Sequence, residues 1–439
     1  MDSVVTSHQS RTRLQLSFVL LALLLYLAAI SVWWHHPADL SALYMAGHLF
    51  ASGQTELVYA APDGFFGGTP PQWYGEIRTF PEFQEELVLP YVYPPLWSAL
   101  LAPLAEAVAP QTFFRGGALL LISLLGASVI LAWRMARGWA IPLWAWILVS
   151  APILATSVAV QMAVMQLQPH VLVVFLTLLA FERLGAGRSA AAGVALGLAV
   201  AMKLSPAPLV LLFLLERNWR ATGWFAATVA VCIVTSLAVA GIEMHYAFLE
   251  SVSDAVAGTM VTGVTFSAEV LLNGFAAQMG LLPPIDMAER SLRIAETPFV
   301  IGLIGKAIMV GGAIWMLKVT ASLDPEKRRV ARFFLLSLLC SLFGPLGWVF
   351  YFLPQILLLP ALLTLLPRPY GTAVVVSAAV LTSWPFFLGL DQVFAGDFPR
   401  AAIGAGALLA LFVAVLLGLQ AQTARRERNT FRVAAPSRT

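Results

Sequence analysis

The chain has 439 residues, of which 59% are hydrophobic and only 11% are charged, and its formal net charge is +3. An average soluble domain is roughly 45–50% apolar and about 25% charged, so this composition excludes a water-soluble globular protein and requires solvation by lipid. The small net charge, without a basic stripe, gives no footprint for nucleic acid. Cys232 and Cys340 both lie in apolar segments, so we expect neither a disulfide nor cysteine chemistry.

The first apolar stretch covers residues 14–34 and contains no charged side chain. A helix of about 20 residues crosses a hydrocarbon core of ~30 Å, so this stretch predicts a full span. It follows Arg11 and Arg13 and runs into a Trp-Trp-His-His-Pro sequence rather than a small-residue cleavage site. This pattern is typical of a retained signal anchor, with residues 1–13 in the cytoplasm.

Further apolar segments follow the first, separated by turn residues or charge clusters. Together they predict an all-α, polytopic transmembrane bundle of about twelve spans that forms a single domain over residues 14–420. The segments cover residues 95–110, 116–135, 140–160, 168–184, 189–215, 222–242, 298–319, 331–345, 347–366, 371–389 and 400–420.

Two connections are too long to be simple turns, and both are acidic. Residues 35–93 carry seven acidic side chains against Arg78, and residues 243–297 carry seven against Arg290 and Arg293. Lys and Arg concentrate instead in the connection 318–332 and in the tail 421–439. Because cytoplasmic loops carry the excess of Lys and Arg, we expect both termini in the cytoplasm and both long loops, with short helices in them, outside.

The middle of the chain allows two arrangements. Strict alternation of spans places four arginines outside, against the positive-inside rule. If 95–110 were re-entrant and 189–215 a hairpin of two half-helices, those arginines would move inside, and Gln168, His170 and Lys203 would face out. We favour strict alternation, because interrupted helices are common where backbone lines a cavity. The four arginines are Arg134, Arg137, Arg183 and Arg188.

Asp39 is the first candidate for chemistry, because a carboxylate held just beyond a span is costly. Pro37 ends the first helix, so one interpretation is that Asp39 only caps the next helix. The other interpretation makes Asp39 a general base that takes a proton from an acceptor hydroxyl at the membrane surface. The same loop closes with Tyr93 before two prolines, which fits a helix start within an aromatic belt.

Other polar residues lie within the apolar segments. Lys203 follows a long apolar run and precedes Pro206, so it either extends to the interface or meets an anion. Gln168 and His170 open another segment, where helix-end hydrogen bonding competes with a functional role. The spacing of the histidines near Asp39 matches no zinc signature, so we expect no metal. No phosphate loop, nucleophile elbow or HExxH motif is present, which disfavours nucleotide-powered transport and proteolysis.

Several motifs, taken in order, resemble glycosyltransferase family 87 over residues 14–366. Where relatives carry Gly and Asn around the glutamine, this chain has Leu167 and His170, and Phe350 stands where a histidine is frequent. Ser267-Ala268-Glu269 and Asn273 stand where relatives often show an Asn and Ser pair. The motifs that carry the resemblance are Asp39-Leu40 with Leu43-Tyr44 and Ala46-Gly47, Tyr93-Pro94-Pro95-Leu96, Gln168-Pro169-His170, Lys203-Leu204-Ser205-Pro206 and Pro345-Leu346-Gly347-Trp348 with Tyr351.

The resemblance implies a GT-C type enzyme of the cell (inner) membrane. Such an enzyme transfers a sugar, mannose by default, from a polyprenyl-phosphate donor to an envelope glycan or glycolipid acceptor on the extracytoplasmic side. Asp39 would be the general base of an inverting displacement, and no cofactor is implied. The candidates for binding the donor phosphate are Lys203, Arg78, His35 and His36, and those for lining the substrate pocket are Tyr44, Tyr93, Gln168, His170, Asn273, Trp348 and Tyr351.

Two other functions remain open from the sequence. A transporter or flippase for a lipid-linked glycan would need charges along its helices, whereas the acidic residues here gather in the loops. A non-enzymatic subunit of an envelope-assembly complex would use the loops to dock its partners. The concentration of acids in the loops favours chemistry at the membrane surface over a conduction path.

Overall fold

The structure is a computed structural model that describes residues 2–62, 65–66, 68–84, 86–256, 258–285, 293–295, 297–394 and 396–434. These residues are almost entirely helical, which confirms the all-α prediction. The α-helices are α1 (Asp2–Val32), α2 (Ala38–Ala51), α3 (Tyr74–Ile77), α4 (Pro95–Ala107), α5 (Pro110–Ala136), α6 (Leu143–Thr156), α7 (Val158–Met165), α8 (His170–Gly185), α9 (Ser189–Met202), α10 (Val210–Leu215), α11 (Trp219–Ala255), α12 (Ala268–Gln278), α13 (Phe299–Thr320), α14 (Pro325–Leu342), α15 (Leu353–Leu358), α16 (Leu362–Leu365), α17 (Arg368–Leu381), α18 (Trp384–Asp391) and α19 (Asp397–Ala434).

Short 3-10 helices and one antiparallel ribbon complete the described elements. In the ribbon, β1 (Thr259–Val261) pairs with β2 (Arg293–Ala295), with Met260 opposite Ile294. Both long loops contain short helices, as predicted, although α11 extends into the second loop after a kink at Gly241 (φ 73°). The 3-10 helices are η1 (Thr55–Leu57), η2 (Pro71–Trp73), η3 (Pro81–Phe83), η4 (Ala207–Leu209), η5 (Val349–Phe352) and η6 (Leu359–Ala361).

Five helices among the described residues have the length and apolar composition needed to cross a membrane. The expectation of about twelve spans is therefore not confirmed. Several predicted segments are divided into shorter helices; the segment 189–215, for example, breaks at Lys203, whose backbone is extended (φ −155°, ψ 129°) before Pro206. The five helices are α1 over Ser10–Val32, α5, α11, α13 and α19 over Asp397–Ala424.

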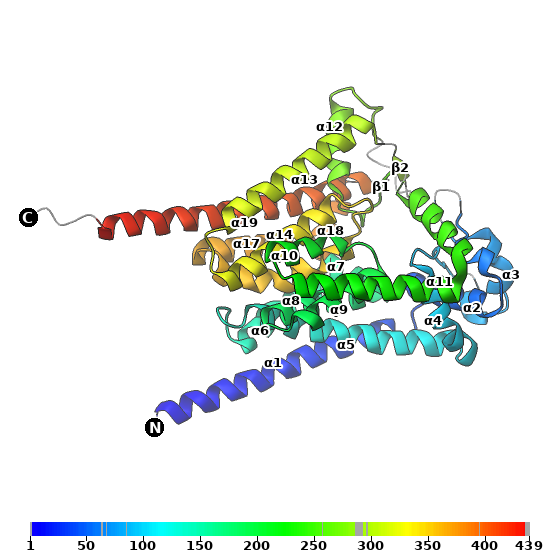
Figure 1. The fold of residues 1–439 in the computed structure, drawn as a ribbon, viewed down its shortest axis with the longest axis horizontal. Helices are drawn as coiled ribbons and strands as arrows, with labels where there is room; N and C mark the ends of the chain where they lie inside the picture. The colour runs from blue at the N-terminus through cyan, green and yellow to red at the C-terminus, as the bar shows by residue number, and fades with distance from the viewer. Residues whose placement is uncertain are drawn as a thin grey trace, which may run out of the picture.

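The bundle has two distinct ends, which Figure 1 shows on opposite sides. The start of α1 and the end of α19 lie at one, which we call the terminal end. Helices α2 and α3 and the β1–β2 ribbon lie at the other, which we call the loop end. Both termini are thus on the same side of the bundle.

The arginines of the middle segments lie at the terminal end, so the strict alternation that we favoured is wrong. Arg134 pairs with Glu182 at 2.8 Å, which joins the last turns of α5 and α8. Arg329, near the start of α14, pairs with Glu216 at 2.9 Å and approaches Gly185 at the end of α8. These contacts bring the ends of α5, α8 and α10 together with the start of α14.

Helix α4 also departs from the predicted alternation of spans, because it packs along α2 at the loop end instead of crossing the bundle. The Tyr44 hydroxyl donates to the backbone oxygens of Ala105 and Val108, at 3.1 and 3.0 Å. Gln111, at the start of α5, donates to the carbonyl of Trp33 just beyond α1. The chain therefore begins α5 at the same end at which α1 finishes.

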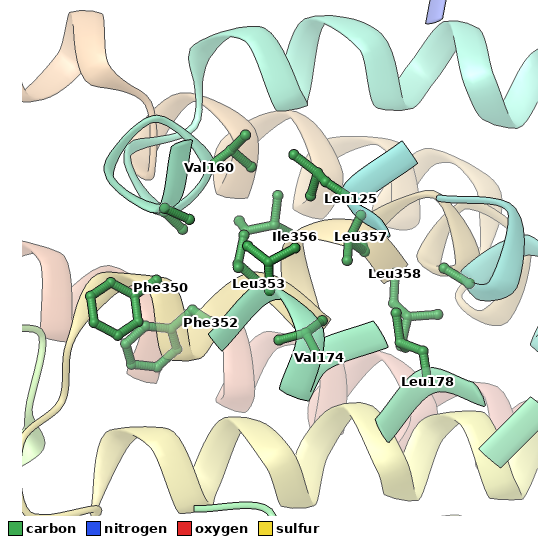
Figure 2. Packing of buried hydrophobic residues seen from close by; sticks show 14 of the residues in the cluster. Leu125, Val160, Val174, Leu178, Phe350, Phe352, Leu353, Ile356, Leu357 and Leu358 are labelled. Carbon is green, nitrogen blue, oxygen red and sulfur yellow. The ribbon is translucent and has the colours of Figure 1, made fainter. Parts of the chain in front are cut away.

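The centre of the bundle is filled by the irregular segment from η5 to α16. Figure 2 shows Leu353, Ile356 and Leu357 between Leu125 of α5 and the α8 residues Val174 and Leu178. Between helices in lipid, such packing stabilises mainly through van der Waals contact. The packing fixes η5 against α7, and it places the rings of Phe350 and Tyr351 against His170 at the start of α8.

Close packing of α9 against α11 positions the end of α9. A Cβ added at Gly193 would lie 2.3 Å from the Ala221 oxygen, and one added at Gly197 would lie 2.7 Å from Thr228 Cβ. This pair of glycines, four residues apart, is the small-residue pattern that lets two membrane helices approach closely. Lys203 follows the last turn of α9.

Candidate functional site

Asp39 lies in the first turn of α2, and it is not the residue that caps the helix. The N-cap position belongs to Pro37, and no side chain caps the helix there. The interpretation of Asp39 as an N-cap is therefore wrong. Its carboxylate lies near the positive end of the helix dipole, which favours negative charge.

The Asp39 carboxyl is partly buried and faces two residues from distant parts of the chain. The side chain of Gln168 hydrogen bonds to it, and the ammonium of Lys203 acts on it electrostatically. Burial raises the pKa of Asp39 to about 6, against the opposing effects of Lys203 and Gln168. A carboxylate with this pKa is suited to accept a proton near neutral pH.

Gln168 is held between Asp39 and Tyr93. Its Oε1 accepts a 2.9 Å hydrogen bond from the Tyr93 hydroxyl, which leaves the amide NH₂ for the Asp39 carboxylate. The preceding residue, Leu167, has φ 43°, the left-handed region that favours glycine. The resemblance described above expects glycine at this position, and the left-handed backbone is a conformational reason for that expectation.

Tyr93 closes the first long loop and belongs to a fixed backbone segment. Its carbonyl accepts a 2.8 Å hydrogen bond from the Tyr59 hydroxyl, and Trp97 donates to the carbonyl of Ala201 at 3.0 Å. The second bond ties the start of α4 to the last turn of α9, close to Lys203. The side chain of Tyr93 is only 3% exposed, and burial raises its pKa, so it remains a hydrogen-bond donor.

Lys203 points into a group of aromatic rings. Its Nζ lies 5.3 Å from the ring centre of Tyr93, 5.5 Å from that of Phe350 and 4.9 Å from that of Tyr351. These are cation–π distances, and they hold the ammonium beside Asp39. The Lys203 ammonium therefore lies among these rings and close enough to the Asp39 carboxyl to act on it electrostatically.

His170 forms the wall beside Lys203. Its buried ring lies 5.0 Å from that of Tyr351 and 5.8 Å from that of Phe350. Within the part of the chain that the structure describes, its Nδ1 has no hydrogen-bond partner. The ring thus presents a polar atom that a substrate group could satisfy.

Trp348 and Tyr351 are placed by the turn at Gly347. Phe266 donates to the Gly347 oxygen at 2.6 Å, and Val349 donates to the Val264 oxygen at 3.0 Å. Trp348 stacks on Phe350 with ring centres 5.9 Å apart. Phe350 was noted only as a departure from the family pattern, yet it contacts Lys203, His170 and Trp348. Its position directly before the candidate Tyr351 was the feature of the sequence that could have indicated a place at the site.

The remaining candidates from the sequence lie outside the group formed by Asp39, Gln168, Lys203 and the residues around them. Tyr44 is buried among phenylalanines, and two backbone carbonyls engage its hydroxyl. Arg78 is exposed at the end of α3, and His35 is exposed after α1. His36 contacts the carbonyl of Leu87 at 3.1 Å, and burial lowers its pKa, which disfavours a charged imidazole.

Asn273 belongs to a second polar cluster at the loop end. Its Nδ2 donates to Thr297 Oγ1 at 3.1 Å and to Thr259 Oγ1 at 3.3 Å. Thr259 also donates to Glu269 at 2.9 Å. This cluster joins α12 to β1, and its hydrogen bonds among the described residues run to Thr259, Thr297 and Glu269, so it is a separate feature of the loop end.

The cluster that the structure assembles, which we call the Asp39 cluster, comprises Asp39, Tyr93, Gln168, His170, Lys203, Phe350 and Tyr351. It joins a carboxylate that can accept a proton to a fixed cation 4.9–5.5 Å from three aromatic ring centres. Such a pair can deprotonate a hydroxyl and stabilise a departing anion in one displacement.

Comparison with models of protein families identifies a family for this chain. The family model described as glycosyltransferase family 87 matches residues 91–347, which is more than half of the chain. The matched region begins at Tyr91 and so contains Tyr93, Gln168, His170 and Lys203. Among the curated proteins, none matches this chain.

Proposed function

The chain belongs to glycosyltransferase family 87 and is a membrane glycosyltransferase, and from this premise we propose that it transfers a sugar from a polyprenyl-phosphate donor to a hydroxyl of an envelope glycan or glycolipid. The observation that carries the proposal is the placement of the Asp39 carboxyl against Gln168 and Lys203. A polyprenyl donor enters from the bilayer, which accounts for a site built at the end of a helical bundle without a nucleotide-binding motif.

The proposed reaction is a single inverting displacement. Asp39 takes the proton from the acceptor hydroxyl as its oxygen bonds to the anomeric carbon of the sugar. The bond from that carbon to the phosphate oxygen breaks, and polyprenyl phosphate leaves with the electron pair. Lys203 stabilises the charge on the departing phosphate, because a fixed cation in a partly buried site needs little reorganisation.

Gln168 and Tyr93 are positioning residues in this scheme. The bond from Tyr93 fixes the Oε1 of Gln168, so that its amide NH₂ is directed to Asp39. The hydrogen bond from Gln168 favours the charged form of the Asp39 carboxylate and opposes the effect of burial. We place His170 at the substrate pocket, where its buried Nδ1 is free to receive a sugar hydroxyl. Mannose is our default for the transferred sugar.

In the membrane, we place the loop end on the extracytoplasmic side of the cell (inner) membrane. Arginines concentrate at the terminal end, as the positive-inside rule requires of the cytoplasmic side. Residues 14–420 then form one membrane domain, with residues 1–13 and the basic tail 421–439 in the cytoplasm. The Asp39 cluster faces the side where envelope acceptors are found.

The test is transfer from radiolabelled polyprenyl-phosphate mannose to an envelope extract by the purified full chain in detergent. We expect Asp39→Asn to reduce the rate by about 10²-fold or more, since a positioned general base contributes 10²–10⁴-fold. Glu56→Gln is the matched control, an exposed acid-to-amide change in the same loop. Transfer that survives Asp39→Asn at the wild-type rate would remove Asp39 as the base.

A further inference from the structure

A second site candidate lies at the terminal end, away from the Asp39 cluster. A cavity of about 440 Å³ opens between the end of α10 and the start of α14. This volume lies within the range of small-molecule pockets. It is lined by Leu215, Glu216, Arg217, Ala321, Pro325, Arg328, Arg329 and Arg332.

The lining of this cavity is strongly cationic. Its four arginines face a single carboxylate, Glu216, which Arg329 engages through both of its oxygens at 2.9–3.1 Å. Arg332 donates to the Thr320 hydroxyl at 2.9 Å, and Arg328 donates to the Ala321 carbonyl at 3.3 Å. Glu216 also acts electrostatically on Arg332, and it is the one carboxylate among the described residues that line the cavity, so the lining carries four positive charges against one negative charge.

The backbone holds Arg217 at the cavity in an unusual conformation. Arg217 has φ 53° in the turn between α10 and α11, a left-handed position that helix ends usually give to glycine. The turn is fixed on both sides, because Asn218 Oδ1 accepts from the amide of Ala221 and Asn218 Nδ2 donates to Ser189 Oγ at 3.0 Å. The positively charged side chain of Arg217 is thus held at a position that favours glycine, beside a cavity that other arginines also line.

The cavity also lies close to the basic tail. Its walls come from the end of α10, the first residue after α13 and the first turns of α14. Next to this wall, Ser322 bonds to Thr423 of α19 at 3.0 Å. Thr423 lies within the basic tail 421–439, and Arg425 and Arg426 follow it closely in sequence. Basic pockets between membrane helices on the side that carries the Lys and Arg excess are suited to anionic headgroups.

We propose that this cavity binds a phosphate group, presented by an anionic phospholipid headgroup or as a free anion. Guanidinium groups match phosphate oxygens in geometry as well as charge, which distinguishes four converging arginines from a general basic surface. Glu216 contacts Arg329 through both of its oxygens, and the other three arginines of the lining outnumber this single carboxylate. This binding is independent of the sugar-transfer chemistry at the loop end.

The test uses the purified full chain in phosphatidylcholine nanodiscs and follows its melting temperature. One arm adds short-chain phosphatidylglycerol, and the other adds inorganic phosphate at constant ionic strength. A ligand that binds the folded state raises the melting temperature. A rise with the lipid alone identifies a headgroup site, and a rise with both identifies a site for the phosphate itself. No rise in either arm overturns the proposal.

Two kinds of variant make the test specific. Arg328→Gln combined with Arg332→Gln should weaken the apparent affinity by roughly tenfold or more, since charge-assisted hydrogen bonds are the stronger ones. Arg217→Gly should weaken it as well while relaxing the left-handed backbone, so a loss of binding there is not a loss of folding. Arg368→Gln, an exposed arginine outside the cavity lining, is the control. An equal loss in this control would show non-specific surface attraction and overturn the site.

Discussion

The Tyr93 hydroxyl donates a 2.9 Å hydrogen bond to Gln168 Oε1, and this bond joins residues that lie 75 positions apart in the chain. Tyr93 ends the first long loop, and Gln168 precedes α8. Through the Gln168 amide, the contact reaches the carboxyl of Asp39. The loop, the helix start and the proposed base are therefore one connected hydrogen-bonded unit.

Tyr93→Phe tests this unit with the loss of a single oxygen. The substitution leaves Gln168 Oε1 with only a 3.4 Å contact to the amide of His170. We expect sugar transfer to fall by roughly tenfold, because Gln168 is then less well oriented toward Asp39, with a stability loss of about 1–3 kcal/mol for an under-satisfied buried acceptor. Rates and melting temperature measure the two effects. Tyr370→Phe, which removes a 2.8 Å bond to Ala414 far from the site, should leave the rate unchanged.

Gly347→Ala tests how the aromatic wall is placed. A Cβ at this position would lie 2.7 Å from the Ser267 nitrogen, and φ is 55°, so alanine is both crowded and strained. We expect a lower melting temperature, corresponding to about 1–3 kcal/mol, and reduced transfer as Trp348 and Phe350 shift. Gly311→Ala in α13, with nothing within 4 Å of the new Cβ, should cause neither change. Normal transfer by Gly347→Ala would show that the turn does not position the wall.

Much of the Asp39 cluster could be predicted from the sequence, because its members are polar residues at the borders of apolar segments. A charge or amide at such a border is costly unless it is used, and Asp39, Gln168 and Lys203 all met that criterion. The structure then brought them together. Their motifs also carry the family resemblance, so chemistry and pattern point to the same positions.

The misplaced elements have identifiable causes. Helix α4 is apolar enough to pass for a span, but its partner is α2, and hydropathy does not distinguish lipid from a neighbouring helix. The break at Lys203 divides the predicted segment 189–215 into α9 and α10. The segments before this break therefore run in the opposite direction to the one that strict alternation predicts. The family resemblance named Asn273 and Tyr44 as pocket candidates, whereas their side-chain hydrogen bonds run to residues outside the Asp39 cluster. Phe350 was missed because an apolar ring gives no polar signal.

The pH dependence of transfer should report Asp39 directly. With its pKa raised to about 6, the carboxylate is protonated below that pH and cannot accept a proton. We expect kcat/KM for the acceptor to fall about tenfold per pH unit on the acid side of about 6. Initial rates between about pH 4.5 and 8.5 give the profile. An acid limb near the ordinary value of 3.8 would show a carboxyl that burial does not perturb.

The same shift predicts how Asp39 affects stability. Because the pKa of Asp39 rises from 3.8 to about 6 on folding, the folded state binds more protons in that interval. The contribution of Asp39 is therefore most favourable below pH 3.8 and is lost as the pH rises through about 6. Asp39→Asn should melt higher than the wild type at about pH 7.5, with the difference shrinking toward about pH 4. A lower melting temperature for Asp39→Asn at neutral pH would contradict the burial of this charge.

Lys203 has two proposed effects, one on the donor phosphate and one on the pKa of Asp39, and substitutions of the lysine separate them. Its ammonium lowers the pKa of Asp39, so Lys203→Met should move the acid limb above pH 6, whereas Lys203→Arg should keep it near 6. Loss of the cation should also reduce kcat/KM for the donor by about 10²-fold, because the departing phosphate loses its partner. Lys306→Met, at an exposed lysine on α13, is the matched control and should change neither quantity. If Lys203→Met lowers the donor rate without moving the limb, the lysine acts on the phosphate alone, and its link to Asp39 is wrong.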